Sequence, residues 1–317
     1  MIKAASTPLR YFLATVSGVV VGAAFMLLPV TASASSSQGF QVSPPENVIS
    51  LNPGTSTKQS VKVTNLTDTE MNLTVATQDF AARGDLGEIT LTNDAGPLYS
   101  LAPWFTVSAR SLSIAPLSTQ SVSYTIAAPV DAEPGGRYGA IVFSTIPPKL
   151  PNGESGASVQ STLASLVLLS VSGNAHQQLE ISSFKSSKPF YEYGPIPFQA
   201  IVKNVGNVHE KPTGQIVIKN MLGLKTGTIS VTPEYVLPVA SRLLTSTLDR
   251  HFMFGRYTAA ITVNVPGVQI LSATTSFWVI PYKIVGLIII ILILLILFFT
   301  KTRKRFRRAF RILAGRE

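Results

Sequence analysis

The chain has 317 residues, a formal net charge of +10 and no cysteine. The positive excess lies at the two ends, because residues 35–282 contain fifteen basic and fifteen acidic side chains. A nucleic-acid-binding protein carries its excess charge on the folded domain, so we expect no nucleic-acid partner. Without disulfides, an exported domain depends on its hydrophobic core. The 246 residues from Ser35 to Ile280 suffice for two ordinary domains.

The first 34 residues have the parts of a secretory signal peptide. Lys3 and Arg10 form a basic start, residues 11–30 are apolar, and Ala32-Ser33-Ala34 fits the small-x-small cleavage rule. We therefore predict a signal peptide over 1–34 that is cleaved at this point. The apolar run is long for a signal peptide, so its retention as a second membrane helix is the alternative.

From residue 40 onward, short segments of alternating apolar and polar residues are separated by turn residues. Lys58–Asn65 and Gln120–Ile126 are examples. Alternation predicts strands with one face on a core and one in water. Many such strands between Pro- and Gly-containing turns are typical of a β-sandwich. Val159–Val171 is nearly continuous in apolar residues in its second half, which predicts a central strand covered on both faces.

The second half of this region repeats the pattern of the first. Residues 198–207 parallel 61–68, because in each an alternating strand ends in Asn before a tight turn. Gly255-Arg256-Tyr257 likewise parallels Gly136-Arg137-Tyr138, and each leads into an apolar strand. The similar sequence pattern in both halves predicts two domains of similar topology.

The expected fold class is therefore an all-β ectodomain of two tandem immunoglobulin-like β-sandwiches, followed by one transmembrane α-helix. We place the first sandwich at 35–174, with a long irregular loop at 146–156, and the second at 175–280. Thr274–Val279 is expected to be the last strand, and it leads almost directly into the helix.

The C-terminal segment predicts a membrane anchor. Sixteen consecutive uncharged residues, Ile284–Phe299, lie within a predicted helix at 281–300, whose length of about 30 Å matches the hydrocarbon core of a bilayer. The tail at 301–317 has eight Lys or Arg residues and one acid. Positive charge stays cytoplasmic, so we expect a single-pass cell-membrane protein with its N-terminal ectodomain outside. The residues expected to set topology and to contact anionic lipids are Lys301, Arg303, Lys304, Arg305, Arg307 and Arg308.

The residue types that commonly serve catalysis or metal binding do not occur here in the spacing of any known catalytic or metal-binding motif. None of the histidines, His176, His209 and His251, has the spacing of a zinc site. No nucleophile elbow or phosphate-binding loop occurs in the sequence. The acidic residues at 85–94 do not match a calcium-binding loop. We therefore expect a protein that is not an enzyme and uses no cofactor and no metal.

Two aromatic pairs are the candidate binding residues. Trp104 and Phe105 follow Pro103 at the start of a predicted strand. Adjacent strand residues face opposite ways, so one of the pair should lie in the core and the other should be exposed or at the domain junction. Tyr191 and Tyr193 lie in an aromatic loop of the second sandwich. Exposed aromatic clusters are typical of binding sites; the alternative is that these rings fill the ends of the cores.

Four segments of the first half carry a family resemblance. They are Val42-Ser43-Pro44-Pro45, Leu51-Asn52-Pro53-Gly54, Val61–Asn65 and Pro129–Ile141, the last including Gly135-Gly136-Arg137-Tyr138. Together they resemble the first domain of WxL-interacting cell-surface proteins. The resemblance implies a signal peptide, two tandem immunoglobulin-like domains, one membrane helix and a basic tail. It also implies peptidoglycan binding by the first domain and binding of a host or partner protein by the second.

The function we expect follows from these features. The chain is read as a non-enzymatic, membrane-anchored bacterial cell-surface protein that holds cell-wall peptidoglycan, a surface protein, or both. The alternative is a chaperone-like or assembly scaffold in an envelope protein complex. In either case, the main-chain N–H and C=O groups of an open strand edge could form hydrogen bonds with a strand of a protein partner.

Overall fold

The computed structural model describes residues 39–84, 86–93, 96, 98–146, 160–265 and 269–313. For Gln269 and residues 304–313 only the backbone is described. The predicted signal peptide at 1–34, most of the loop predicted at 146–156 and the last four tail residues lie outside the described residues.

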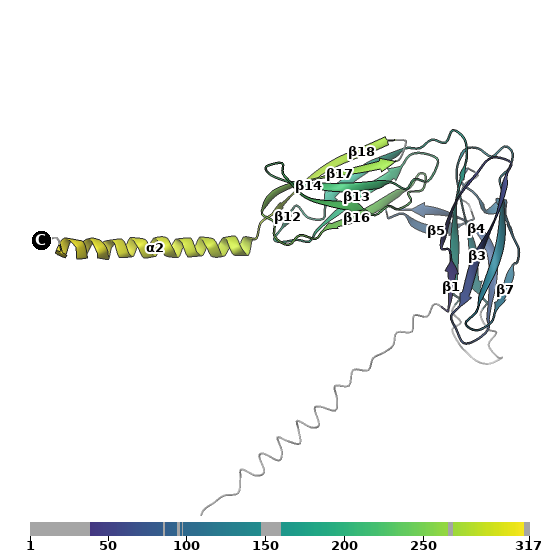
Figure 1. The fold of residues 1–317 in the computed structure, drawn as a ribbon, viewed down its shortest axis with the longest axis horizontal. Helices are drawn as coiled ribbons and strands as arrows, with labels where there is room; N and C mark the ends of the chain where they lie inside the picture. Colours follow the sequence, from purple (N-terminus) through teal and green to yellow (C-terminus); the bar gives the residue numbers. More distant parts are fainter. Residues whose placement is uncertain are drawn as a thin grey trace, which may run out of the picture. The chain divides into compact units, whose positions relative to one another are not determined.

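The strands between residues 40 and 171 form two sheets that we call the first sandwich (Figure 1). One sheet has the order β1-β3-β8-β6; the other has the order β2-β10-β9-β4-β5, with β7 also paired to β4. The elements are β1 (Phe40–Ser43), β2 (Glu46–Leu51), β3 (Ser56–Asn65), β4 (Met71–Arg83), β5 (Glu88–Thr92), the 3₁₀ turn η1 (Ala102–Trp104), β6 (Phe105–Val107), β7 (Ser111–Ile114), β8 (Thr119–Ala127), β9 (Gly135–Thr145) and β10 (Thr162–Val171).

The core of the first sandwich follows from the alternation in its strands. In β3, Val61 and Val63 are fully buried, while the alternate residues Ser60 and Lys62 are exposed. In β8, Val122, Tyr124 and Ile126 are buried in the same way. Each buried side chain of this kind contributes about 1.5–3 kcal/mol relative to its exposed state, which is why the period of two determines the face that turns inward.

The strands between residues 179 and 279 form the second sandwich. Its sheets have the orders β11-β13-β16 and β12-β18-β17-β14-β15. The strands are β11 (Leu179–Ser186), β12 (Phe190–Tyr191), β13 (Ile196–Asn204), β14 (Thr213–Asn220), β15 (Lys225–Val231), β16 (Ser241–Leu248), β17 (Gly255–Val265) and β18 (Gln269–Val279). β18 therefore begins well before Thr274, where the sequence placed the last strand, because it pairs with β17 along the whole length of both strands.

Aromatic rings join the two sheets of the second sandwich. Phe277 of β18 packs edge-to-face on Phe198 of β13, with 5.5 Å between ring centroids, and stacks on Tyr257 of β17 at 5.7 Å. Phe198 and Phe277 are fully buried. Such ring pairs stabilise a core beyond the area they bury.

A pair of asparagines gives the internal repeat a physical basis. Asn65 ends β3 and Asn204 ends β13, and both are fully buried. In each, the side-chain amide donates to the main-chain oxygen four residues on, at 2.7 Å to Thr69 and 2.8 Å to Val208. Each Oδ1 accepts from the N–H two residues on, at 2.9 and 2.8 Å. The buried amide thus satisfies the main chain of the turn that follows each strand.

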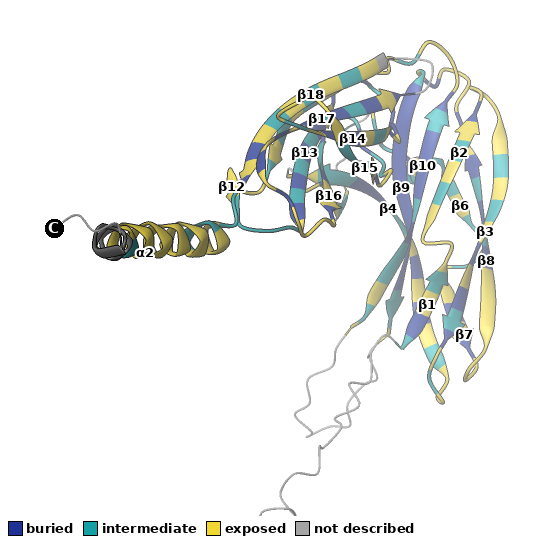
Figure 2. Cartoon of the chain, turned by 60° about the vertical axis from the view of Figure 1, so that its left-hand side comes forward, coloured by how far each residue is buried: buried dark blue, intermediate teal, exposed yellow. Residues whose placement is uncertain are grey.

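The strand β10 is covered on both faces, as its apolar sequence predicts. It lies between β2, with which it is parallel, and β9, with which it is antiparallel. Val167 and Leu169 belong to the core of the first sandwich, whereas Leu168 belongs to a cluster that includes Leu237 and Ala240 of the second. The neighbouring β9 is buried along most of its length (Figure 2). The second sandwich therefore covers part of the outer face of this sheet, around Tyr138 and Leu168.

The C-terminal helix α2 (Tyr282–Leu313) follows β18 after only Ile280 and Pro281. It extends beyond the predicted helix at 281–300 and continues through the basic segment. Within the described part of the chain it is the one helix long and apolar enough to cross a membrane, over Tyr282–Arg303, and none of that span is buried by the protein (Figure 2). The predicted fold class, two tandem immunoglobulin-like sandwiches and one C-terminal apolar helix, is confirmed.

Candidate binding site at the junction of the two sandwiches

Main-chain contacts around Asn207 connect the two sandwiches. Its main-chain oxygen accepts from the N–H of Gly136 at 2.8 Å, and its side-chain amide donates to Pro134 O at 3.1 Å. Its Oδ1 accepts from the N–H of His176, in the linker, at 2.8 Å. Gly135 has φ +138°, and a Cβ at this position would lie 3.0 Å from Asn207 O. Glycine is thus required for both the backbone conformation and the close approach.

A row of aromatic rings crosses the junction. Tyr138 of β9 lies at its centre, with ring centroids 5.9 Å from Phe80 and 6.3 Å from Tyr99 in the first sandwich. On the other side, the His209 ring is 5.7 Å from Tyr138 and 5.5 Å from Tyr235. The Tyr138 hydroxyl and His209 Nδ1 are 3.3 Å apart. Rings from both sandwiches therefore form one continuous contact.

Burial shifts the pKa values of the titratable side chains in and beside this row of rings. Loss of solvent lowers the pKa of His209 from 6.5 to about 4, so its imidazole is neutral at pH 7. The same effect raises the pKa of the Tyr138 hydroxyl. It also raises the pKa of Glu210, against a hydrogen bond from Gln177 that lowers it. Among the described residues, Glu210 Oε1 is buried and has no hydrogen-bond donor.

A cavity of about 330 Å³ opens at the junction, and both sandwiches contribute its walls. Its apolar lining includes Phe80 and Leu168 from the first sandwich and Tyr235 and Leu237 from the second. The full lining is Glu46, Phe80, Ile89, Leu166, Leu168, Lys211, Pro233, Glu234, Tyr235, Leu237 and Arg242. Apolar walls with a few polar groups are typical of binding pockets.

Charged side chains accompany this cavity. Arg242 pairs with Glu234, its Nε lying 2.6 Å from a carboxylate oxygen, and it donates from a terminal nitrogen to Gly87 O in the first sandwich at 2.7 Å. The ammonium of Lys211 lies 4.7 Å from the centroid of the Tyr235 ring. The cation–π contact and the ion pair hold these charges beside the apolar surface.

A second junction cavity, of about 290 Å³, is more uniformly apolar. It is lined by Phe80, Ala81, Ala82, Tyr99, Tyr138, Leu237, Pro238 and Val239. Val239 has φ +60°, a conformation that β-branched residues rarely adopt, and its side chain is 74% exposed. Its N–H donates to Asn204 O at 3.0 Å, which helps to hold the strained turn. An apolar side chain is thus displayed to solvent beside an apolar cavity.

The two predicted aromatic pairs lie in different sandwiches of the structure. Trp104 ends the 3₁₀ turn η1, and Phe105 begins β6. Both are partly buried against the core of the first sandwich, so the expected division into one core and one exposed or junction residue is wrong. The alternation rule fails because Trp104 belongs to a helical turn and not to the strand.

Tyr191 and Tyr193 lie in the second sandwich and are also partly buried. The Tyr191 ring packs edge-to-face on Phe277 at 6.0 Å, and its hydroxyl accepts from the N–H of Lys188 at 2.8 Å. Tyr191 therefore helps to fill one end of the core, and the two aromatic pairs do not come together in one site. A binding role for any of the four remains a prediction.

Trp104 does border a pocket within the first sandwich. This pocket, of about 340 Å³, is lined by Leu98, Trp104, Pro129, Asp131, Ala132, Glu133 and Arg137. The Arg137 guanidinium lies 5.4 Å from the centroid of the Trp104 ring and donates to Gly136 O. Burial lowers the pKa of Arg137, and in the described part of the chain its Nε has no hydrogen-bond partner.

The remaining predicted residues concern topology and metal binding. Lys301 and Arg303 are exposed at the C-terminal end of the apolar span. The side chains of Lys304, Arg305, Arg307 and Arg308 lie outside the described residues. Asp85 and Asp94, the outer acids of the 85–94 cluster, also lie outside them. Within the described ranges, no three His, Asp or Glu side chains are close enough to hold a metal ion.

Sequence reasoning missed the junction. The sequence offers His209 only as a possible zinc ligand, and no pattern in it indicates a role for Tyr138, Glu210 or Leu237. One signal was available: residues 135–143 lack the polar alternation of a strand with a solvated face, and all of them are buried. Such a pattern indicates that something covers the second face of the sheet, but not which segment does so.

Comparison with known proteins gives structural matches only. No model of a known protein family and no curated protein matches the chain. A chain of the CFA/I fimbrial chaperone–tip adhesin complex has 15% identity and a TM-score of 0.39, with 74% of this chain and 98% of that chain covered. The Salmonella enterica SafB chaperone–SafA pilin complex provides a chain with 9% identity, a TM-score of 0.37 and coverages of 74% and 96%. The E. coli chaperone DraB has 11% identity, a TM-score of 0.34 and coverages of 76% and 98%. Because all three TM-scores are below 0.5, these matches support no conclusion about the fold or the function of this chain.

Proposed function

We propose that this chain is a non-enzymatic, membrane-anchored envelope protein that holds another surface protein, as a chaperone-like or assembly scaffold. The junction of the two sandwiches is its contact site. The observation that supports this most directly is the 330 Å³ cavity, which has an apolar lining contributed by both sandwiches and charged side chains beside it. A surface of this composition suits a protein segment that inserts apolar side chains.

Strand edges beside the cavity support a protein partner. β2 and β5 are outer strands of their sheet, and Glu46 of β2 and Ile89 of β5 both line the cavity. An outer strand has main-chain groups that can pair with an added strand. A partner can therefore combine backbone pairing at an edge with side chains placed in the cavity.

The membrane part of the proposal depends on α2. Its apolar span is long enough to cross a bilayer. The basic residues that follow it favour a cytoplasmic tail and an external position for both sandwiches. A scaffold anchored in this way would act at the outer surface of the membrane.

Site-specific photocrosslinking of the full chain in cells tests the proposal. A photoreactive residue at Val239, beside the junction, should give one discrete protein adduct. The matched control is the same residue at Lys58, which is exposed on β3 of the first sandwich. Leu237→Asp, which places a charge in the cavity, should abolish the Val239 adduct. Adducts of equal yield at both positions, or a Val239 adduct unaffected by Leu237→Asp, would contradict the proposed site.

A second candidate function rests on the pocket beside Trp104. An aromatic ring, a buried guanidinium and two carboxylates offer stacking and hydrogen bonding to a polar polymer. The resemblance to WxL-interacting proteins makes peptidoglycan the polymer to test. Trp104→Ala in the full chain should reduce retention on sedimented cell walls several-fold, and unchanged retention would remove this candidate.

A further inference from the structure

Six large apolar side chains are exposed at one end of the second sandwich. They come from three separate segments: β12, the turn between β14 and β15, and the loop before β17. We call them the apolar rim: Phe190 (62% exposed), Met221 (65%), Leu222 (75%), Leu224 (61%), Phe252 (82%) and Phe254 (67%). Exposed apolar patches of this kind mark contact with a protein or a membrane.

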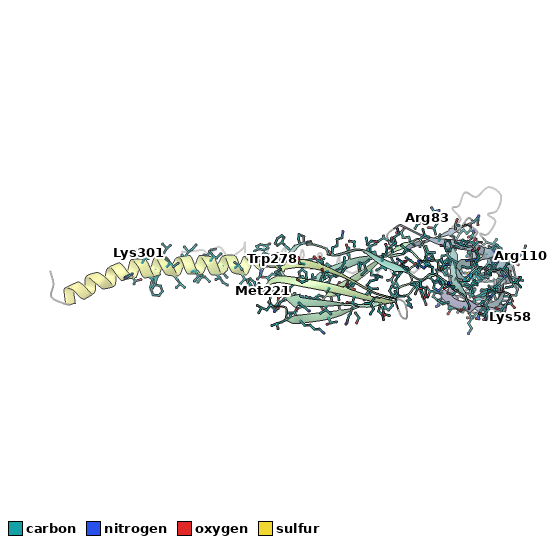
Figure 3. All side chains as sticks on the ribbon, turned by 90° about the horizontal axis from the view of Figure 1, so that it is seen from above. Lys58, Arg83, Arg110, Met221, Trp278 and Lys301 are labelled. Carbon is teal, nitrogen blue, oxygen red and sulfur yellow. The ribbon has the colours of Figure 1, made fainter. Side chains whose placement is uncertain are left out.

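Strand pairing brings the three segments together. Phe190 pairs with Trp278 near the end of β18. Gly255, which follows Phe254, pairs with Val279 at the end of the same strand. The Met221 methyl group lies 3.0 Å from the position of a Cβ on Gly255, so the β14–β15 turn lies beside the start of β17. Met221 and Trp278 lie at this end of the sandwich (Figure 3).

The chain enters its apolar helix from the same end. Ile280 and Pro281 are the two residues between β18 and α2, and they span at most about 7 Å. The N–H of Ile280 donates to Tyr191 O at 2.8 Å, and Lys283 of α2 pairs with Glu192 at 3.2 Å. The polar region of a bilayer is about 5–8 Å thick on each side of the hydrocarbon. A helix that crosses the membrane therefore brings this end of the sandwich into the polar region.

We propose that the apolar rim inserts into the boundary between headgroups and acyl chains, in the leaflet where α2 enters. This inference rests on the membrane anchor of the proposed function. The second sandwich is then a peripheral membrane domain as well as a tethered one. Its contact with lipid orients it on the bilayer, which a two-residue connection alone does not do.

The chemistry of the rim and its surroundings favours lipid over a second protein. Trp278 and Tyr282, both exposed, lie next to the rim and are the residue types enriched at membrane interfaces. The exposed basic side chains in or beside these segments are Lys188, Lys225, Arg250 and Arg256, against one exposed acid, Asp249. Basic groups beside apolar ones favour a surface of anionic lipids.

Depth-dependent fluorescence quenching of the full chain tests the proposal. The chain is reconstituted into vesicles of equal parts phosphatidylcholine and phosphatidylglycerol, and part of the phosphatidylcholine carries a nitroxide near the top of its acyl chain. Trp104 and Trp278 are replaced by Phe, and a single Trp is placed at Phe252 (F252W). The matched control places it at Lys58 (K58W) in the first sandwich. Leu222→Trp is the substitute reporter if F252W does not fold, as judged by its circular dichroism.

We expect the F252W emission to be quenched several-fold more than that of K58W, and to be shifted to shorter wavelength. Equal quenching in a chain that remains in the vesicles after an alkaline carbonate wash would overturn rim insertion and leave the anchor intact. Loss of the chain in that wash would overturn the anchor, and the present inference with it. An unquenched F252W whose emission depends on the protein-to-lipid ratio would assign the rim to contact between copies, and would also overturn the inference.

Discussion

Acidification should weaken the fold through His209. The ring is 7% exposed and packs between Tyr138 and Tyr235. Its pKa falls from 6.5 to about 4 in the folded chain because burial disfavours the imidazolium. Between these two pH values the unfolded state binds the proton and the folded state does not. The free energy of unfolding therefore decreases as the pH falls from about 6.5 to about 4.

The size of this effect follows from the difference in pKa. A shift of one pKa unit corresponds to about 1.4 kcal/mol of free energy. Protonation of His209 in the unfolded state therefore lowers the free energy of unfolding by on the order of 3 kcal/mol between pH 6.5 and pH 4, and most of this decrease has occurred by about pH 4.5. Lys211 and Glu210 are the neighbouring charged groups in the chain. Burial raises the pKa of Glu210, so this carboxyl acts in the opposite sense: it is protonated more readily in the folded state and stabilises the fold as the pH falls.

A matched variant separates the contribution of His209 from the rest. Urea denaturation of the full chain in detergent, followed by tryptophan fluorescence, gives the free energy of unfolding at pH 7 and pH 4.5. His209→Gln has no titration in this range and retains a polar group near the Tyr138 hydroxyl. We expect the wild type to lose on the order of 2–3 kcal/mol more than His209→Gln over this interval. Equal losses in the two proteins would refute the assignment of a buried neutral imidazole to the junction.

Two further predictions concern buried positions of the fold, and both are measured by urea denaturation of the full chain. Asn204→Ala and Asn65→Ala should each lower the free energy of unfolding by about 2–3 kcal/mol, because buried main-chain groups lose their partners; a loss at only one site would contradict the structural repeat. Gly139→Ala should cost about 1–3 kcal/mol, because its Cβ would lie 2.6 Å from the Phe105 ring. Gly286→Ala, which has open space around it in α2, is the control and should not lower the free energy of unfolding.

The sandwich architecture was predictable because alternation reports directly on burial. In β3 and β8 the apolar residue at every second position lies in a core, as expected. The parallel between Asn65 and Asn204 was also visible, and the structure gives it a cause in the two sets of turn hydrogen bonds. Such local patterns need no knowledge of which strands lie next to one another.

The junction was not predictable because its contacts join residues far apart in the chain. Tyr138 and His209 are separated by 71 positions, and neither has a neighbour in sequence that indicates the other. The 3₁₀ turn at Trp104 was missed for a different reason, since one turn of helix leaves no periodic pattern to detect. Residues that contact a second domain have the same composition as core residues, so the sequence shows burial without showing its cause.

The second sandwich has different contacts at its two ends, and this has a consequence for the proposed scaffold. β14 begins just after Lys211 at the junction and ends just before Met221 in the apolar rim. β17 runs the other way, from Gly255 at the rim to Val265, and pairs with β14 and β18. Eleven residues of β17 span about 36 Å at the usual rise of a strand. A continuous hydrogen-bonded sheet of this length makes the second sandwich a stiff spacer. A partner held at the junction would therefore stay at a set distance from the bilayer, and the first sandwich would contact the side of the partner that faces away from the membrane.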